Sequence, residues 1–173
     1  MSRLGFFGGS FNPITIAHVD LILKAIDEYS LDKVYFVPMN DKYQKQGLIP
    51  LNKRKEMIEL AINNNSKLDI FFLDNDKETK AIDSFEKIDK EFDTDERFFI
   101  MGSDNYKKIG DWKDYEKLKK YKFIVLDRES DEFSKTNNIS STKVRDAIKT
   151  NDDIKGYVSE DVERYIKENK LYF

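Results

Sequence analysis

The sequence predicts an α/β fold. A mainly parallel sheet of five to six strands is doubly wound with helices in a Rossmann-like manner and is followed by C-terminal helices. Two observations support this class. Short apolar runs recur at even spacing along the 173 residues, and segments with apolar residues three or four positions apart lie between them. Strands that alternate with helices in this way are typically parallel and joined by right-handed crossovers.

The elements follow in order along the chain. Five apolar runs are predicted as buried strands, namely Leu4–Phe7, Val34–Val37, Leu68–Leu73, Phe98–Met101 and Phe123–Leu126. Five helices are predicted between and after them, over His18–Glu28, Asn52–Asn63, Ile82–Phe92, Ser141–Lys149 and Ser159–Asn169. The polar segment Asp127–Asn138 predicts a loop, and the apolar end of Lys170–Phe173 is expected to dock on the body.

The composition excludes several kinds of chemistry. The chain has no cysteine and one histidine, His18, so disulfides, thiolate metal sites, a cysteine nucleophile and a two-histidine metal motif are excluded. The formal net charge of −3 argues against a strongly basic nucleic-acid-binding protein. No apolar stretch approaches about 18 residues and no leader pattern is seen, so we expect no membrane segment and a cytoplasmic protein.

A glycine-rich segment, Gly8-Gly9-Ser10-Phe11-Asn12-Pro13-Ile14-Thr15-Ile16-Ala17-His18, joins the first strand to the first helix. Glycines allow a ligand to approach the backbone closely. His18 lies near the helix start, where free N–H groups and the positive end of the helix dipole favour an anion, and Thr15 lies three residues before it. The segment lacks the G-x-G-x-x-G pattern of dinucleotide-binding dehydrogenases. It therefore predicts a phosphate-binding site at the carboxyl edge of the sheet.

A second polar cluster, Ile139-Ser140-Ser141-Thr142-Lys143-Val144-Arg145, opens a later helix. Ser140 and Ser141 are typical helix N-caps, and Arg145 is a neighbour of Ser141 on one helix face. The cluster is either a second anion site or an ordinary cap beside a surface arginine. We expect one domain over 1–173, with the sheet and its helices in 1–127 and the phosphate-binding motif and C-terminal helices in 128–173.

Together these two clusters resemble the nucleotidyltransferase superfamily that carries a T/H-x-G-H motif and an I-S-S-T-x-x-R motif, in the same order. Within it the chain is most similar to the bacterial nicotinate-nucleotide adenylyltransferases. Further segments carry that resemblance along nearly the whole chain: Leu4–Pro13, Leu31–Pro38, Gly102–Asn105 followed by Trp112, Val162–Ile166 and Leu171–Tyr172.

The resemblance implies that a phosphate oxygen of a mononucleotide attacks the α-phosphorus of ATP and pyrophosphate leaves. The expected partners are ATP and a pyridine mononucleotide, in NAD biosynthesis, and the surface aromatic residues leave room for a homo-oligomer. Mg²⁺ would arrive on the ATP phosphates, with no metal ligand from the protein.

The resemblance also assigns residues. The implied catalytic residues are His18, Thr15, Lys45 and Arg145, with Lys42 as the rival of Lys45. ATP would be bound by Gly8, Gly9, Ser10, Phe11, His18, Gly102, Asp104, Ile139, Ser141, Thr142 and Arg145. The acceptor would be bound by Asn12, Lys80, Ala81 and Trp112.

Three departures from the family pattern bear on the acceptor and on activity. Ala17 replaces the glycine of the first motif, Asn12 replaces a common aspartate, and Lys80-Ala81 stands where the family has a Tyr-Thr pair. Nicotinate mononucleotide is the first expectation for the acceptor. Nicotinamide mononucleotide, phosphopantetheine, and an inactive nucleotide-binding regulator remain as alternatives.

Overall fold

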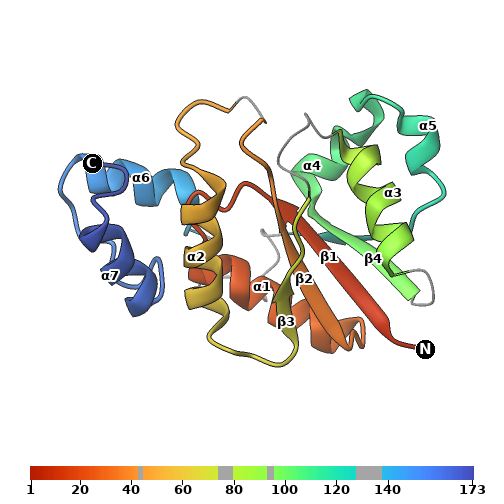
Figure 1. Cartoon of the computed structure of the whole chain (residues 1–173), viewed down its shortest axis with the longest axis horizontal. Helices are drawn as coiled ribbons and strands as arrows, with labels where there is room; N and C mark the ends of the chain where they lie inside the picture. Colours follow the sequence, from red (N-terminus) through yellow and green to blue (C-terminus); the bar gives the residue numbers. More distant parts are fainter. Residues whose placement is uncertain (43–44, 74–79, 93–95, 128–137) are drawn as a thin grey trace.

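Five parallel strands form the sheet of the protein (Figure 1), which is a computed structural model that describes residues 1–42, 45–73, 80–92, 96–127 and 138–173. Within those ranges the strand order is β3-β2-β1-β4-β5, and every neighbouring pair is parallel. The strands are β1 (Arg3–Gly9), β2 (Lys33–Pro38), β3 (Leu68–Ile70), β4 (Glu96–Gly102) and β5 (Phe123–Leu126). The predicted α/β class is confirmed.

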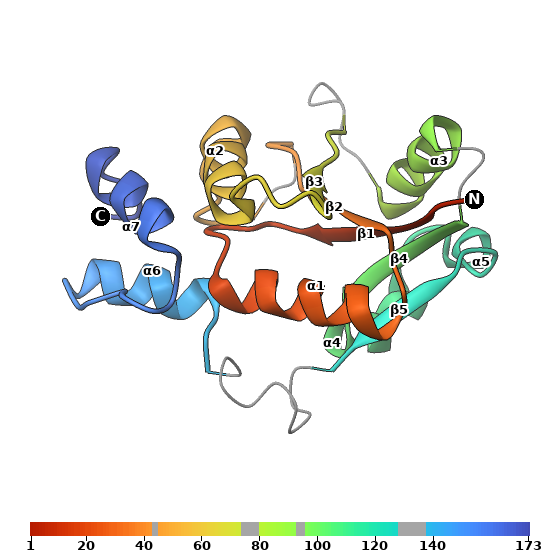
Figure 2. The ribbon, with the colours of Figure 1, turned by 90° about the horizontal axis from the view of Figure 1, so that it is seen from below.

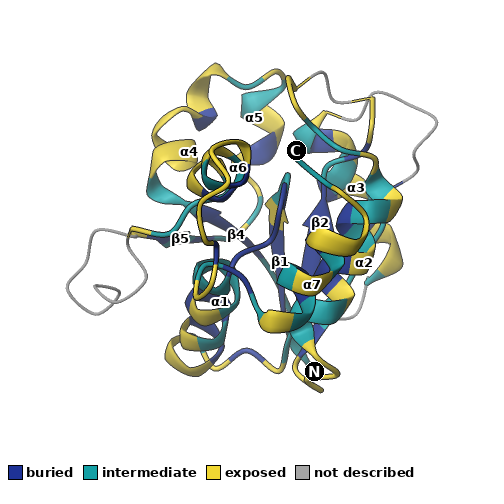
Figure 3. Cartoon of the chain, turned by 90° about the vertical axis from the view of Figure 1, so that its left-hand side faces the viewer, coloured by how far each residue is buried: buried dark blue, intermediate teal, exposed yellow. Residues whose placement is uncertain are grey.

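Helices cover both faces of this sheet. They are α1 (Ile16–Glu28), α2 (Leu51–Ile62), α3 (Ala81–Glu91), α4 (Ser103–Lys107), the short 3₁₀ helix η1 (Ile109–Asp111), α5 (Tyr115–Leu118), α6 (Ser141–Lys149) and α7 (Glu160–Glu168). Figure 1 shows α2, α6 and α7 on one side of the sheet and α3, α4 and α5 on the other. Figure 3 shows the strands as the buried centre, with exposed residues on the outer helices.

Each face of the sheet has its own apolar core, because alternate side chains of a strand point to opposite faces. Phe7 of β1 belongs to the core formed with α1, α2, α6 and α7. Leu4 and Phe6 belong to the core formed with α3, η1 and α5. The two cores therefore assign the helices to two separate layers.

The chain reverses its direction of winding at β1. From β1 it passes to β2 and β3 on one side, and it then crosses over to β4 and β5 on the other side. A doubly wound sheet binds its ligands at such a switch point, in the crevice outside the carboxyl ends of the strands. Here that switch point lies where β1 ends at Gly9 and β4 ends at Gly102.

The sequence located the elements well, with two differences. All five predicted helices are present, with ends that differ by two residues at most. The third strand ends at Ile70 instead of Leu73, although the amide of Phe71 still donates to Phe36 O. Helices α4, η1 and α5 were not predicted, because they are too short to show an apolar period. Of the predicted loop, residues 128–137 lie outside the described ranges.

The predicted docking of the C-terminal tail is confirmed for two of its residues. Leu171 and Tyr172 are half-buried against the core of α1, α2, α6 and α7. Phe173 is 71% exposed. In the described ranges, no helix combines the length and apolar character needed to cross a membrane.

Two glycines of β1 meet different surroundings. A Cβ on Gly5 would lie 2.7 Å from Ile100 Cδ1 and 2.9 Å from Val34 Cγ2. A Cβ on Gly8 would meet no atom within 4 Å. The close contact at Gly5 brings the middle of β1 against its neighbours, whereas Gly8 faces open space at the end of the strand.

This difference predicts the effect of adding one methyl group at each position. Gly5→Ala should lower the free energy of unfolding by about 1–3 kcal/mol, because the added carbon overpacks the core. Gly8→Ala should stay within about 0.5 kcal/mol of the wild type. Urea unfolding of both variants measures the difference, and equal stabilities would contradict the packing described here.

Candidate active site

The buried polar side chains of the described residues gather at one edge of the sheet. They are Asn12, Thr15, Asn40 and Arg54, which come from the segments that follow β1 and β2 and from helix α2. Burying a polar group costs free energy unless it is hydrogen-bonded, so such a concentration marks an organised site. These residues form the centre of the candidate site.

His18 is fixed at the N-terminus of α1 by Thr15, the N-cap residue of that helix. The backbone N–H of Thr15 donates to His18 Nδ1 at 3.0 Å, and Thr15 Oγ1 lies 2.8 Å from the same nitrogen. A backbone N–H can only donate, so Nδ1 accepts, and the neutral ring carries its proton on Nε2. The two predicted catalytic residues are thus in direct contact, and Nε2 of the imidazole is a hydrogen-bond donor.

Aromatic rings support the imidazole from the core. The ring of Phe11 lies 5.4 Å from the ring of His18 in an edge-to-face arrangement, and the ring of Phe7 lies at 6.3 Å. Phe11 is only 2% exposed, and a Cβ on Gly9 would lie 3.0 Å from its Cζ. The predicted ATP-binding residue Phe11 therefore places its ring beneath the glycine backbone and beside the histidine.

Open space lies above the ends of the two central strands. Neither Gly8 of β1 nor Gly102 of β4 has an atom within 4 Å of where a Cβ would be. Asp104, in the first turn of α4, is exposed and lies two residues beyond Gly102. The predicted ATP-binding residues Gly102 and Asp104 thus lie at the end of β4 and the start of α4, at the switch point.

Helix α6 docks its N-terminus on the glycine-rich segment (Figure 2). Ser141 Oγ donates to Pro13 O at 2.7 Å, and Arg145 Nη1 donates to Asn12 O at 2.7 Å. Arg145 Nη2 also donates to Thr142 Oγ1 at 3.2 Å, and Ser140 caps the helix by accepting from the amide of Lys143. Ile139 is half-buried just before this cap. The two polar clusters, more than 120 residues apart in sequence, therefore form one site.

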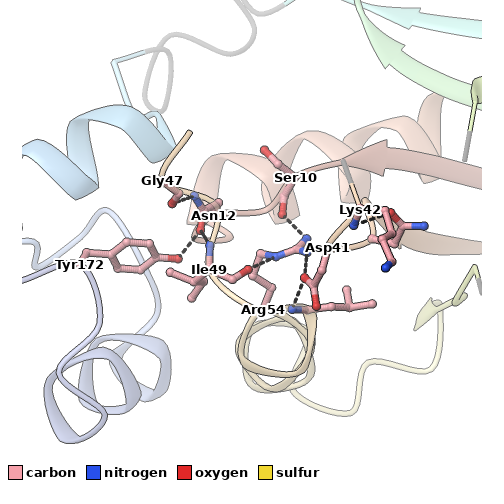
Figure 4. A network of polar contacts seen from close by, with 10 residues as sticks. Ser10, Asn12, Asp41, Lys42, Gly47, Ile49, Arg54 and Tyr172 are labelled. Atoms are coloured by element: carbon pink, nitrogen blue, oxygen red, sulfur yellow. Dashed lines mark hydrogen bonds and ion pairs between the residues drawn. The ribbon is translucent and has the colours of Figure 1, made fainter. Parts of the chain in front are cut away.

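A lysine reaches the same segment from the loop that follows β2. Lys45 Nζ donates to Ser10 Oγ at 3.1 Å. Lys42 is the alternative candidate from the sequence. Its backbone N–H donates to Asn40 Oδ1 at 3.1 Å. Figure 4 shows the Lys42 side chain directed away from Ser10. The geometry therefore supports Lys45 as the cation of this loop.

Arg54 holds the loop of Lys45 against the glycine-rich segment, and Figure 4 shows this network. Its side chain is 0% exposed. Its guanidinium donates to Ile49 O at 2.8 Å, to Ser10 O at 3.0 Å and to Asp41 Oδ1 at 3.1 Å. Burial lowers the pKa of this guanidinium, and the hydrogen bond to Asp41 opposes that shift.

The sequence did not assign a role to Arg54. Helical spacing could have revealed its burial, because Arg54 lies three and four residues before Met57 and Ile58, on the buried face of α2. A cation on an apolar helix face must satisfy its N–H groups inside the protein.

The side chain of Asn12 is directed into the protein. Its Nδ2 donates to Gly47 O at 2.8 Å, and its Oδ1 accepts from the amide of Ile49 at 3.3 Å and from the Tyr172 hydroxyl at 2.9 Å. These partners use both lone pairs of the amide oxygen. The predicted acceptor-binding residue Asn12 thus fastens three segments together, and its role toward an acceptor stays a prediction.

The other predicted acceptor residues lie on the layer of α3. Lys80 precedes α3, where its backbone N–H donates to Asp83 Oδ2 at 3.0 Å, and Ala81 is the first residue of that helix. Trp112 follows η1 and is half-buried against the core of α3 and α5. Residues 74–79, which precede Lys80, lie outside the described ranges. In the part of the chain described, no three His, Asp or Glu side chains gather as a metal site.

Comparisons with known proteins identify the family to which the chain belongs. The model of a family described as cytidylyltransferase-like matches residues 6–147, and the chain belongs to that family of nucleotidyltransferases. Within the family it groups with the nicotinate-nucleotide adenylyltransferases. The probable nicotinate-nucleotide adenylyltransferase of Acholeplasma laidlawii is 34% identical to this chain, over 96% of this chain and 95% of that one. Its counterpart from Clostridium acetobutylicum is 32% identical, over 99% and 100%.

Solved structures show the same fold. The Plasmodium falciparum nicotinic acid mononucleotide adenylyltransferase complexed with APC has a TM-score of 0.79 at 25% identity, over 99% of this chain and 98% of that one. The crystal structure of a putative nicotinate-nucleotide adenylyltransferase from Vibrio parahaemolyticus has a TM-score of 0.81 at 20% identity, over 99% of this chain and 96% of that one.

Proposed function

We propose that this enzyme transfers the adenylyl group of ATP to nicotinate mononucleotide, forming deamido-NAD and releasing pyrophosphate. The observation that carries the proposal is the docking of α6 on the glycine-rich segment, through Ser141 to Pro13 O and Arg145 to Asn12 O. This contact brings together the two clusters that we propose to bind the phosphates of ATP. The names of the curated relatives support the same reaction.

The chemistry needs positioning more than it needs a base. A phosphate oxygen of the mononucleotide is already ionised at neutral pH, so it can attack the α-phosphorus of ATP directly. A new P–O bond forms as the bond to the β-phosphate oxygen breaks, and pyrophosphate leaves with its charge. The protein has to hold the reacting phosphates in line and to stabilise the charge that spreads over them.

Different residues of the site have different roles in positioning the phosphates and stabilising their charge. His18 presents its Nε2–H at the end of α1, where it can donate to the transferring phosphate. Lys45 and Arg145 reach the glycine-rich segment from the loop after β2 and from α6, so they place positive charge on two sides of it. Gly8 and Gly102 leave room for the nucleotide over the strand ends.

Mg²⁺ is expected with ATP as its substrate complex, where it would neutralise phosphate charge. The described site offers cations and N–H donors to phosphate, and its composition suits a metal that arrives already bound to the nucleotide.

The acceptor is assigned to the layer of α3. Trp112 offers a half-exposed indole for stacking on a pyridine ring, and Lys80 is an exposed cation for the nicotinate carboxylate. Because Lys80 and Ala81 stand where the family has Tyr-Thr, nicotinamide mononucleotide is the second candidate acceptor.

A panel of acceptors tests the reaction. With Mg-ATP, pyrophosphate release should be fastest with nicotinate mononucleotide, and Lys80→Met should raise the KM for that acceptor about tenfold, because it loses an ion pair. The same variant should leave the KM for nicotinamide mononucleotide unchanged. Pyrophosphate release with phosphopantetheine alone, or with no acceptor, would contradict the proposal.

Removing the imidazole tests the role of His18. His18→Ala should lower kcat about a hundredfold, because it removes a donor to the transferring phosphate. The free energy of unfolding should fall by only about 1 kcal/mol, the cost of a lost helix-capping contact. Asp20→Ala, at an exposed position of the same helix, is the control. Steady-state kinetics beside urea unfolding separates the two effects, and an unchanged kcat would remove His18 from the mechanism.

The two lysines of the second loop can be told apart. Lys45→Met should lower kcat about tenfold or more, because it removes a cation beside the reacting phosphates. Lys42→Met should retain most of the activity, since the Lys42 side chain is directed away from Ser10. Pyrophosphate release measures both, and the reverse order would assign the catalytic role to Lys42.

A further inference from the structure

The C-terminal tail reaches the glycine-rich segment. Tyr172 lies 160 residues after Asn12, and its hydroxyl donates to Asn12 Oδ1 at 2.9 Å. Helix α7 and the tail turn back toward the sheet, and the contact joins the end of the chain to the first loop (Figure 4). None of the assigned catalytic or substrate-binding roles uses this tyrosine.

The turn that directs the tail is built from two successive features. Helix α7 ends in a Schellman motif, in which the amide of Leu171 donates to Ile166 O and the amide of Lys170 donates to Lys167 O. Lys170 has the left-handed φ of 50° that this motif requires. Tyr172 has a φ of 68°, which the cap does not require and which is unfavourable for a bulky residue. The surrounding contacts of Tyr172 must therefore hold that conformation.

The amide of Asn12 can satisfy its partners in one orientation only. Gly47 O can only accept, so it must face Nδ2, and the amide N–H of Ile49 can only donate, so it must face Oδ1. The Tyr172 hydroxyl takes the remaining lone pair of Oδ1. Burial raises the pKa of Tyr172, against the influence of Arg145 and Arg54, so the phenol stays neutral and can donate. The tyrosine thus completes and fixes the amide.

The fixed amide anchors the loop that carries Lys45. Gly47 and Ile49 lie two and four residues after Lys45, and both are bound to Asn12. The backbone carbonyl of Asn12 receives Arg145 at the same time. A rotation of the Asn12 side chain would therefore break the two hydrogen bonds that tie Gly47 and Ile49 to the segment to which Arg145 is also attached. It would leave Arg54, which donates to Ile49 O, as a remaining hold on the Lys45 loop.

We propose that Tyr172 is a positioning residue for adenylyl transfer: its hydroxyl locks the Asn12 amide, which holds the Lys45 loop at the glycine-rich segment. The inference rests on the proposed function for its kinetic consequence. The structural consequence, release of the loop at Gly47 and Ile49, does not depend on that function and can be measured without substrate.

Amide hydrogen exchange tests the lock in the full chain. Tyr172→Phe keeps the ring but removes the hydroxyl, and it should speed the exchange of the Ile49 amide about tenfold, because Asn12 Oδ1 loses one of the donors that orient it. Tyr165→Phe, on α7 and outside the site, is the matched control and should leave the Ile49 amide unchanged. The sheet amide of Val34, which donates to Lys67 O, reports global opening. Unchanged exchange at Ile49, or equal acceleration at Val34, would overturn the proposal.

Kinetics tests the consequence for the reaction. Tyr172→Phe should lower kcat about tenfold, since a small displacement of a catalytic group has effects of that order or larger. The KM for ATP should change less than twofold, and Tyr165→Phe should behave as the wild type. In a Lys45→Met background, Tyr172→Phe should cause no further loss, because its effect passes through the Lys45 loop. An undiminished additional tenfold loss in that background would overturn the proposal.

The two proposals fail in different ways. A wild-type protein that releases no pyrophosphate with any acceptor contradicts the proposed function. The exchange rate of the Ile49 amide in Tyr172→Phe then tests by itself whether the Tyr172 hydroxyl orients the Asn12 amide. An active wild type with a Tyr172→Phe variant that matches Tyr165→Phe in kcat contradicts the lock alone.

Discussion

The arrangement of the site depends on the hydrogen bonds of the buried Arg54 guanidinium. Taking a charge out of water costs several kcal/mol, and that cost is offset only when the N–H groups find well-placed acceptors. Arg54 finds them in Ser10 O, from the segment after β1, and in Ile49 O and Asp41 Oδ1, from the segment after β2. Because the guanidinium cannot be satisfied without all three, its burial fixes the first loop and the second loop relative to α2.

The glycine-rich segment is held from both sides through its backbone carbonyls. Ser10 O accepts from Arg54 of α2, whereas Asn12 O and Pro13 O accept from Arg145 and Ser141 of α6. Phe11, between them, has a left-handed φ of 44°, and this turn lets the neighbouring carbonyls face different elements. The glycine-rich segment is therefore held in place by the protein's own hydrogen bonds, which is the preorganisation that electrostatic stabilisation of a transition state requires.

The sequence predicted what depends on local patterns and missed what depends on distant pairing. Apolar runs and helical spacing located the strands and the long helices, and the resemblance to a nucleotidyltransferase family implied that the glycine-rich and serine-rich clusters belong to one site. The inward role of the Asn12 amide was not predictable, because its partners Gly47, Ile49 and Tyr172 lie 35 to 160 residues away. Helical spacing places Arg54 on the buried face of α2, but its acceptors Ser10 O and Asp41 Oδ1 lie 44 and 13 residues away and were equally unpredictable. A polar residue in a motif can thus bind the protein itself as well as a ligand.

The two cores of the sheet separate the two halves of the proposed reaction. His18, Lys45 and Arg145 are attached to elements of the layer of α1, α2 and α6, whereas Lys80 and Trp112 belong to the layer of α3. The sheet separates the two layers, and its switch point lies between β1 and β4, where the phosphates are proposed to react. A substitution on the α3 layer can therefore change the acceptor without disturbing the contacts of Arg54 and Asn12. This separation explains physically how the departures at Lys80 and Ala81 can coexist with the contacts that Arg54 and Arg145 make in the glycine-rich segment.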